Sequence, residues 1–372
     1  MKRSWVPLYG TLAGSDHAKP TATVRTFGVV ENMTNEFVTP FGWGSGHLQT
    51  VRSRVVPNNY DLETVGQHRN GLVPMKDGSG DQLGVRLHQT YRRSSLGLVV
   101  LIHGLGGSSE SDYVRATAMS LLTAGFNVAR VDLRGAGLSW FTSSGLYHAG
   151  RTEDLRTVVR QLAVMPEAQV VGAPRIFLMG FSLGGNTTIK LLGEPTTGLP
   201  ILAAVSVSAP LDLAVGAVHL RGAAFGLYEK YLLVGLKRQV LRPGPRGEPR
   251  VSEDERQLVE QARTIAEFDD AITAPRNGWR DANEYYQVNS CAQFLSKVTT
   301  PLLVIHSADD PMVPSEPYRQ VDWAALRRKG FVQEIITDKG GHVGFHEKGA
   351  RLPWYANVAR NFFQAVIRSS SG

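Results

Sequence analysis

The chain has a single cysteine, Cys291, among its 372 residues. One thiol cannot form an intrachain disulfide, and its rarity is typical of a reducing compartment. Long apolar runs are absent too, since none reaches the roughly 18 residues that a membrane span needs. The opening residues 1–14 lack the uninterrupted apolar block of a secretion signal. These absences predict a soluble protein of the cytoplasm.

Long runs of one charge are also missing. The formal net charge is +7, but the basic residues are scattered and no basic segment is interleaved with aromatics, which argues against nucleic acid as a partner. No group of ligating side chains has the spacing of a metal site. The glycine-rich segment 103–109 lacks the lysine of a phosphate-binding loop. We therefore expect no metal and no cofactor.

Short continuous apolar runs alternate with helical patterns through two parts of the chain, which is typical of strands buried on both faces. The expected strands are 97–103, 126–132, 175–181, 201–209, 300–307 and 332–338. The expected helices are 111–124, 151–164, 183–192, 315–329 and 354–367. This alternation predicts an α/β fold with a mostly parallel central sheet and helices on both of its faces.

The remaining segments have other patterns. Residues 1–58, rich in Gly, Pro, Thr and Asn, are expected to form an irregular N-terminal arm. An antiparallel hairpin is expected over 59–92, with "NNYDLETV" and "LGVRLHQTY" on either side of "KDGSGDQ". The α/β core is expected to run over 59–215 and to resume over 299–372. A helical cap insertion is expected between them, at 216–298.

The segment "RIFLMGFSLGGNTTIKLLG" (175–193) places the pentapeptide "GFSLG" where an expected strand ends and a helix begins. Glycines on both sides of Ser182 allow a tight turn that presents its hydroxyl at the carboxyl edge of the sheet. The positive end of the next helix lies beneath it. Ser182 is therefore the predicted nucleophile, and it needs a base and an acid that orients the base.

The base is expected after Ser182 in the chain, because hydrolases with this turn follow the order Ser, acid, His. His342, in a glycine-rich loop after the last expected strand, is the predicted base, with His346 as its competitor. His306 lies in an apolar run and is more typical of a core histidine. His219 belongs to the expected cap.

The acid is expected in "HSADDPMVP" (306–314), which follows an expected strand. Asp310 is the predicted acid, because it stands three residues after Ser307, the small residue that ends that strand. Asp309 is the alternative, and the member of the pair that is not used is expected to be solvated or to cap a helix. Asp212, one strand earlier, is a third candidate.

A tetrahedral intermediate needs preorganised N–H donors for its oxyanion. One is expected to be the amide of Leu183 at the helix start, and the other the amide of Leu105 in "HGLGGSS" (103–109). His103 in the same segment is expected to be a structural, hydrogen-bonded residue. Asp132 is expected to tie together the loop that follows its strand, and the charged residues of "EFDD" (267–270) to be solvated or helix-capping.

Further motifs follow one another in order from about residue 40 to the end of the chain. They are "GSGHLQT", "HGLGGSS", "RGAGLS", "YHAGRTEDL", "GFSLGGN", "SAPLDL", "EFDDAITAP", "ADDP" and "GGHVGF". With them the sequence resembles the α/β-hydrolase superfamily, in the branch of YheT-like hydrolases, plant embryogenesis-associated proteins and mammalian abhydrolase-domain lipid hydrolases. The resemblance implies a cofactor-free serine hydrolase that cleaves carboxylic esters, from short acyl esters to lipid acyl chains.

The predicted function is hydrolysis of an ester substrate through an acyl-enzyme on Ser182. An acyltransferase with the same three residues and a noncatalytic ligand-binding protein are the alternatives. Apolar side chains recur in the expected cap at 225, 228, 232, 236 and 240. They either line an acyl pocket and contact a lipid interface, or pack on the sheet.

Overall fold

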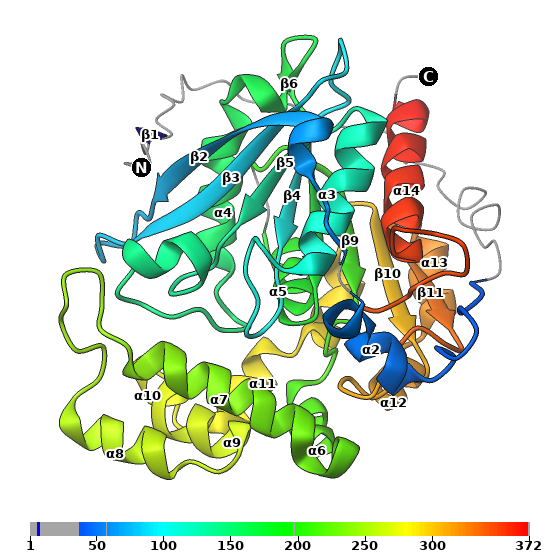
Figure 1. Ribbon diagram of the computed structural model, residues 1–372. Coiled ribbons are helices and arrows are strands. Elements are labelled where there is room, and N and C mark those ends of the chain that lie inside the picture. The colour runs from blue at the N-terminus through cyan, green and yellow to red at the C-terminus, as the bar shows by residue number, and fades with distance from the viewer. Residues whose placement is uncertain (1–5, 8–36, 57, 196–197, 371–372) are drawn as a thin grey trace.

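The computed structural model describes residues 6–7, 37–56, 58–195 and 198–370 (Figure 1). A nine-stranded sheet runs through the middle of the molecule in the order β1-β2-β3-β5-β4-β8-β9-β10-β11. Its strands are β1 (Val6–Pro7), β2 (Gly66–Pro74), β3 (Gln82–Thr90), β4 (Leu98–Ile102), β5 (Asn127–Val131), β8 (Ile176–Phe181), β9 (Ile201–Val207), β10 (Leu302–Ser307) and β11 (Val332–Thr337). A separate small hairpin joins β6 (Gln169–Val170) to β7 (Ala173–Pro174).

The strands from β5 to β11 in this order are all parallel, and only β3 runs antiparallel to its neighbours β2 and β5. Because parallel strands share one direction, the loops after β4, β8, β9, β10 and β11 all leave from the same edge of the sheet. This edge is where ligand sites form in open α/β sheets.

The apolar runs are continuous because both faces of the sheet are covered. In β4, Leu98, Val100 and Ile102 join one buried cluster, while Val99 and Leu101 join the other. Helices α4 (Thr152–Ala163), α5 (Leu183–Gly193) and α13 (Trp323–Lys329) contribute to the first cluster. Helices α3 (Asp112–Ala124) and α14 (Trp354–Ser370) contribute to the second. The predicted α/β-hydrolase architecture, a mostly parallel sheet with helices on both faces, is confirmed.

Between β9 and β10 the chain forms a helical insert that lies below the sheet in Figure 1. We use "helical insert" for its helices α6 (Leu213–Gly222), α7 (Leu227–Leu241), α8 (Glu253–Gln261), α9 (Ile265–Phe268), α10 (Ala274–Arg276) and α11 (Ala282–Asn289). The insert has its own buried cluster, to which Leu232, Val259 and Phe268 belong. The boundaries 216–298 of a separate cap remain a prediction.

Three local predictions are wrong. The first hairpin strand is Gly66–Pro74 and not 58–65, because Asp61 caps a short 3₁₀ turn at Leu62–Thr64. The helix expected over 315–329 is divided into α12 (Glu316–Arg319) and α13, since Asp322 caps a new helix start through the Ala325 amide.

The third correction concerns the expected irregular arm, most of which lies outside the described residues. Residues Gly46–Val55 form a helix, α2, whose first turn is capped by Ser45. The Ser45 side chain accepts a hydrogen bond from the Leu48 amide, the usual interaction of a serine N-cap. Within the part of the chain that the structure describes, no helix has both the length and the apolarity to cross a bilayer.

Candidate active site

Ser182 lies in the sharp turn between β8 and α5. Its backbone has φ 52° and ψ −121°, a region that is strained for a residue with a side chain. The flanking residues must be glycines because neighbouring backbone atoms lie too close to leave room for a Cβ. A Cβ on Gly180 would lie 2.2 Å from the Gly184 carbonyl oxygen, and one on Gly184 would lie 2.5 Å from the His103 carbonyl oxygen. The turn therefore holds the serine hydroxyl in a fixed place at the edge of the sheet.

Three predicted site residues, from loops far apart in the chain, meet at this edge. His342 Nε2 lies 3.0 Å from Ser182 Oγ, and His342 Nδ1 lies 2.9 Å from Asp310 Oδ2. With the proton on Nδ1, the imidazole donates to Asp310 and accepts from the Ser182 hydroxyl. The loops after β8, β10 and β11 thus bring a hydroxyl, a carboxylate and an imidazole into one hydrogen-bonded row.

The carboxylate of Asp310 is held at both oxygens. Oδ1 accepts hydrogen bonds from the amides of Met312 (2.8 Å) and Val313 (2.9 Å), while Oδ2 faces His342. Burial raises the pKa of Asp310, but the charge and the hydrogen bond of His342 outweigh it, so the pKa lies below its usual value. The group therefore remains a carboxylate beside the imidazole.

Asp309 has a different role from the one expected for the unused acid. Its Oδ1 accepts hydrogen bonds from the Ser307 hydroxyl (2.6 Å) and the Gly341 amide (3.0 Å). The expectation of a solvated or helix-capping carboxylate is wrong, because the loop after β11 passes directly over this side chain. Asp309 positions the backbone next to His342.

Helix α2 holds the same loop from the other side. The Thr50 hydroxyl accepts a hydrogen bond from the His342 amide (2.8 Å), and the Gln49 side chain accepts one from the His346 amide (2.7 Å). The imidazole of His346 contacts Ser53 at 3.1 Å. His346, the competing base, therefore faces α2. Burial, followed by the charge of Arg52, lowers its pKa to about 4.

The other candidates lie in structural positions. The ring of His306 stacks on Tyr318 with centroids 3.8 Å apart, and burial lowers its pKa to about 4. His219 Nε2 contacts the Pro311 carbonyl oxygen at 3.2 Å. Asp212 caps α6 by accepting a hydrogen bond from the Val215 amide. His306 Nδ1 also lies 4.0 Å from Asp310 Oδ2, but none of the three side chains is hydrogen-bonded to Ser182 or His342.

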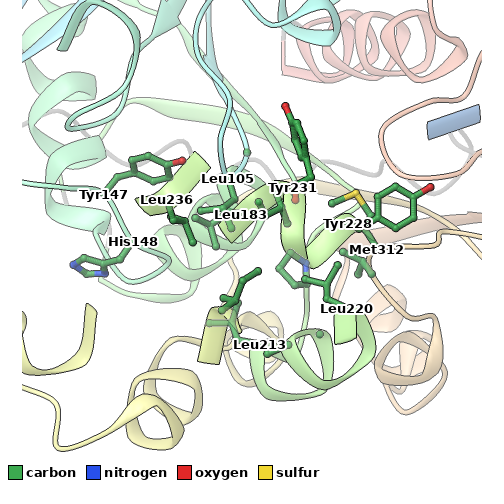
Figure 2. Close-up of a pocket in the computed structure, with 18 of the residues that line it drawn as sticks. Leu105, Tyr147, His148, Leu183, Leu213, Leu220, Tyr228, Tyr231, Leu236 and Met312 are labelled. Atoms are coloured by element: carbon green, nitrogen blue, oxygen red, sulfur yellow. The ribbon is translucent and has the colours of Figure 1, made fainter. Parts of the chain in front are cut away.

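The glycine-rich segment after β4 is held by two tyrosines. The Gly104 amide donates to the Tyr113 hydroxyl (3.0 Å), and the Gly106 amide donates to the Tyr147 hydroxyl (2.7 Å). Leu105 lies between them and lines the cavity beside Ser182 (Figure 2). Leu183 also lines the cavity and is the first residue of α5.

His103 and Asp132 hold the surrounding loops. His103 contacts the Gly104 carbonyl oxygen through Nδ1 and accepts a hydrogen bond from the Leu133 amide at Nε2. Asp132 accepts hydrogen bonds from the amides of Ser109 and Leu138. Both side chains connect the segment after β4 to the segment after β5, the structural roles expected for them.

A cavity of about 1040 Å³ opens above Ser182, between the sheet edge and the helical insert. Figure 2 shows its apolar lining, to which Leu105, Leu183, Leu213, Leu220, Leu236 and Met312 contribute. Polar side chains also line it, among them those of His148, Arg151, Asp269, Thr273 and Asn277. The cavity therefore offers both apolar and polar surface to a ligand.

Asp269 is a buried carboxyl at the cavity wall, a position that its local sequence pattern does not reveal. It is buried in a turn of π-helix at Asp269–Thr273 and accepts hydrogen bonds from Thr273 (2.6 Å) and from the Tyr286 hydroxyl (2.8 Å). Burial raises its pKa to about 6. The expectation of a solvated or capping carboxylate is wrong for Asp269, because the insert folds over it. Asp270 does cap, accepting from the Ala282 amide.

The chain is similar to known proteins in both sequence and fold. The family described as the alpha/beta hydrolase fold matches residues 97–349. YheT of Escherichia coli, whose name assigns it to the esterases, is 31% identical over 83% of this chain and 87% of its own. A monoacylglycerol lipase of Saccharomyces cerevisiae is 29% identical over 72% of this chain and 59% of its own. The crystal structure of the Pyrococcus furiosus esterase Pf2001 matches 83% of this chain and 95% of its own, with a TM-score of 0.53 and 18% identity.

The chain belongs to the α/β-hydrolase fold family. The branch expected from the motifs is confirmed by relatives that include YheT and the yeast lipase. Within this family the chain is a hydrolase of the esterase and lipase type, which confirms the predicted class of carboxylic ester hydrolase. Among the described residues, no three ligating side chains are grouped closely enough to hold a metal ion.

Proposed function

We propose that the protein hydrolyses carboxylic esters through an acyl-enzyme on Ser182, with His342 as general base and Asp310 as the acid that orients it. The observation that carries this proposal is the continuous row Ser182–His342–Asp310, with separations of 3.0 and 2.9 Å, at the wall of a large cavity. A nucleophile, a base within hydrogen-bond reach and a third group that orients the base are the parts that acyl transfer requires.

In the first half of the reaction, Ser182 Oγ attacks the ester carbonyl carbon and its proton passes to His342 Nε2. Asp310, which is ionised and buried, stabilises the imidazolium that forms. The tetrahedral intermediate collapses when His342 returns this proton to the leaving alkoxide. In the second half, His342 takes a proton from water as the water oxygen attacks the acyl carbon. The second tetrahedral intermediate collapses when His342 returns this proton to Ser182 Oγ, and the carboxylic acid is released.

The amides of Leu105 and Leu183 are the proposed donors to the oxyanion. The position of Leu183 supports this role, because it is the first residue of α5. The first amides of a helix have no hydrogen-bond acceptor within the helix and are free to bind an oxyanion. The surroundings of Leu105 support the same role for its amide, because the neighbouring amides of Gly104 and Gly106 already donate to tyrosine hydroxyls. The loop is thus fixed around the amide that remains, as preorganised stabilisation of charge requires.

The cavity supports substrates with a sizeable acyl chain. Its volume of about 1040 Å³ reaches the upper end of the usual range for ligand pockets, roughly 300–1000 Å³. Apolar side chains from α6 and α7, such as Leu220 and Leu236, line the same cavity as Ser182. We propose that the segment 216–298 acts as a cap that roofs this acyl site, consistent with a relative that is named a monoacylglycerol lipase.

Hydrolysis of p-nitrophenyl esters from acetate to palmitate by the wild type and by Ser182→Ala tests this function. We expect turnover by the wild type and a loss of at least about a thousandfold in the variant. Ser206→Ala is the matched control, because Ser206 is a buried serine on the adjacent strand β9, paired with Gly180. Equal rates for wild type and Ser182→Ala, or an equal loss in both variants, would contradict the proposal.

A further inference from the structure

Exposed apolar side chains gather on the helical insert. Large apolar residues that are unusually exposed there are Val218 (68%), Phe225 (101%), Leu227 (64%), Tyr231 (52%) and Val234 (46%). We call these five residues the mouth patch. Single exposed apolar side chains are ordinary on soluble proteins, but several on two consecutive helices mark a surface that contacts something else.

The cavity opens at this patch. Leu227 and Tyr231 line the cavity, although more than half of each side chain is exposed, so they lie where the cavity meets the surface. Residues of α2 line the opposite side of the opening. Two contacts join its sides: His47 Nδ1 to the Tyr228 hydroxyl (3.0 Å), and the Arg54 guanidinium to the Tyr231 hydroxyl (2.6 Å).

The exposed charge on the three helices that carry and face the mouth patch has one sign, while the acids Glu110 and Asp112 line the cavity from the side of α3. Helices α2, α6 and α7 carry six basic residues, Arg52, Arg54, Arg221, Lys230, Lys237 and Arg238. Their only acid is Glu229, which is buried and accepts a hydrogen bond from the Ile265 amide. Of the basic residues, Arg54, Arg221, Lys230 and Arg238 are exposed. An apolar patch rimmed by positive charge is complementary to a surface of anionic lipids.

The backbone holds the fully exposed ring of Phe225 in an unfavourable conformation. Ala224 and Phe225 have φ of 49° and 56°, and Gly226 follows with 75°. A positive φ is costly for an aromatic residue, and packing does not offset it, since the Phe225 side chain is 101% exposed. The turn between α6 and α7 thus presents a phenyl ring to the surroundings, where burial in lipid would stabilise it.

We propose that the mouth patch and its basic rim dock the protein on an anionic lipid surface, with the opening of the cavity toward the lipid. The docking itself does not depend on catalysis. The consequence that long-chain esters enter the cavity directly from the lipid rests on the proposed esterase function.

Flotation with lipid vesicles tests the docking, using the Ser182→Ala protein so that no lipid is hydrolysed. We expect binding to phosphatidylcholine vesicles that contain about 30% phosphatidylglycerol, at least about tenfold tighter than to pure phosphatidylcholine. Higher salt should weaken this binding because exposed charges are screened. Absence of binding to the anionic vesicles, or equal binding to both kinds, would overturn the proposal.

Surface variants locate the contact. Val218→Ser with Phe225→Ser, and separately Arg221→Gln with Lys230→Gln, change exposed residues that do not line the cavity. Each pair should weaken binding to anionic vesicles by about tenfold or more. Val171→Ser is the matched control: its side chain is also 101% exposed, and it lies beside β6 at the other end of the molecule (Figure 1).

Hydrolysis of p-nitrophenyl acetate by the same surface variants, made with Ser182 intact, separates this proposal from the proposed function. We expect unchanged rates in all of them, because the small ester reaches Ser182 from water. Vesicle binding that survives both pairs of substitutions, or that the Val171→Ser control loses equally, would show that this surface is not the docking site. That result would contradict the docking even if the esterase activity were established.

Discussion

Asp309 and Asp310 are adjacent in the chain, yet their carboxylates hold different parts of one loop. Asp310 Oδ2 lies 2.9 Å from His342 Nδ1, whereas Asp309 Oδ1 accepts the amide of Gly341, one residue earlier, at 3.0 Å. One carboxylate therefore faces the imidazole and the other fixes the backbone that carries it.

This division predicts unequal effects of two similar substitutions. Asp310→Asn should lower kcat by roughly a thousandfold or more, because an amide cannot stabilise the imidazolium and favours the wrong tautomer. Asp309→Asn keeps an oxygen that can accept from Gly341 and should cost about tenfold or less. Steady-state kinetics with p-nitrophenyl butyrate measure both, and losses of equal size or in the reverse order would contradict the assignment.

Tyr147, one of the two tyrosines that hold the glycine-rich segment, offers a second prediction. Tyr147→Phe removes the acceptor of the Gly106 amide and loosens the backbone around Leu105. We expect kcat to fall by about tenfold with little change in KM, because oxyanion contacts act mainly in the transition state. Tyr60→Phe is the control, since its hydroxyl donates to the distant Arg351 carbonyl. If Tyr147→Phe changed KM alone, the hydroxyl would contribute to substrate binding instead.

Contact between α2 and the loop after β10 predicts a steric effect. A Cβ on Gly46 would lie 1.8 Å from the Asp309 carbonyl oxygen, so Gly46→Ala must displace one of the two segments. We expect a loss of about 1–3 kcal/mol in the free energy of unfolding, together with reduced activity. In Gly44→Ala the nearest atom would be Thr39 Oγ1 at 3.6 Å, an ordinary contact, so this variant should resemble the wild type in urea unfolding and in turnover.

The buried carboxyl of Asp269 predicts a pH dependence of stability. Its pKa is about 6 in the folded protein, against about 3.9 in an unfolded chain. Because the folded state binds this proton more tightly, the stabilisation is complete below about pH 4 and is lost as the pH rises through 6. Relative to Asp269→Asn, the wild type should lose roughly 1–3 kcal/mol between pH 4 and 7.

Urea unfolding of both proteins across this pH range measures the difference. The Asn variant is the reference because it keeps the shape of the side chain but does not titrate. A free-energy difference between wild type and Asp269→Asn that is constant with pH would contradict the buried position of this carboxyl.

The sheet could be predicted from the sequence because its signal is local. A strand such as β4, buried on both faces, must be apolar at every position, and glycines must flank a serine in a turn as tight as the one at Ser182. Chain order limited the candidate bases to the four histidines that follow Ser182. The candidate acids were limited instead by the requirement that the acid follow a strand of the sheet.

The features that the sequence did not reveal depend on contacts between distant segments. Helix α2 has few large apolar residues and contributes mainly through Gln49 and Thr50, whose partners lie almost 300 residues away. Asp309 and Asp310 are adjacent and identical in type, so the local sequence does not distinguish them. Their different roles depend on the path of the loop after β11, which places the Gly341 amide at Asp309 and the His342 imidazole at Asp310. Asp269 resembles a surface acid in its own segment, and only the packing of the insert buries it.

Chemical modification of the serine tests the central claim most directly. After the protein reacts with a fluorophosphonate probe, digestion and mass spectrometry of the peptides identify the modified residue. A single phosphonate adduct on Ser182, formed at a much lower rate in His342→Gln, is the result expected. An unmodified Ser182, or an adduct on another residue that also forms in Ser182→Ala, would contradict the account.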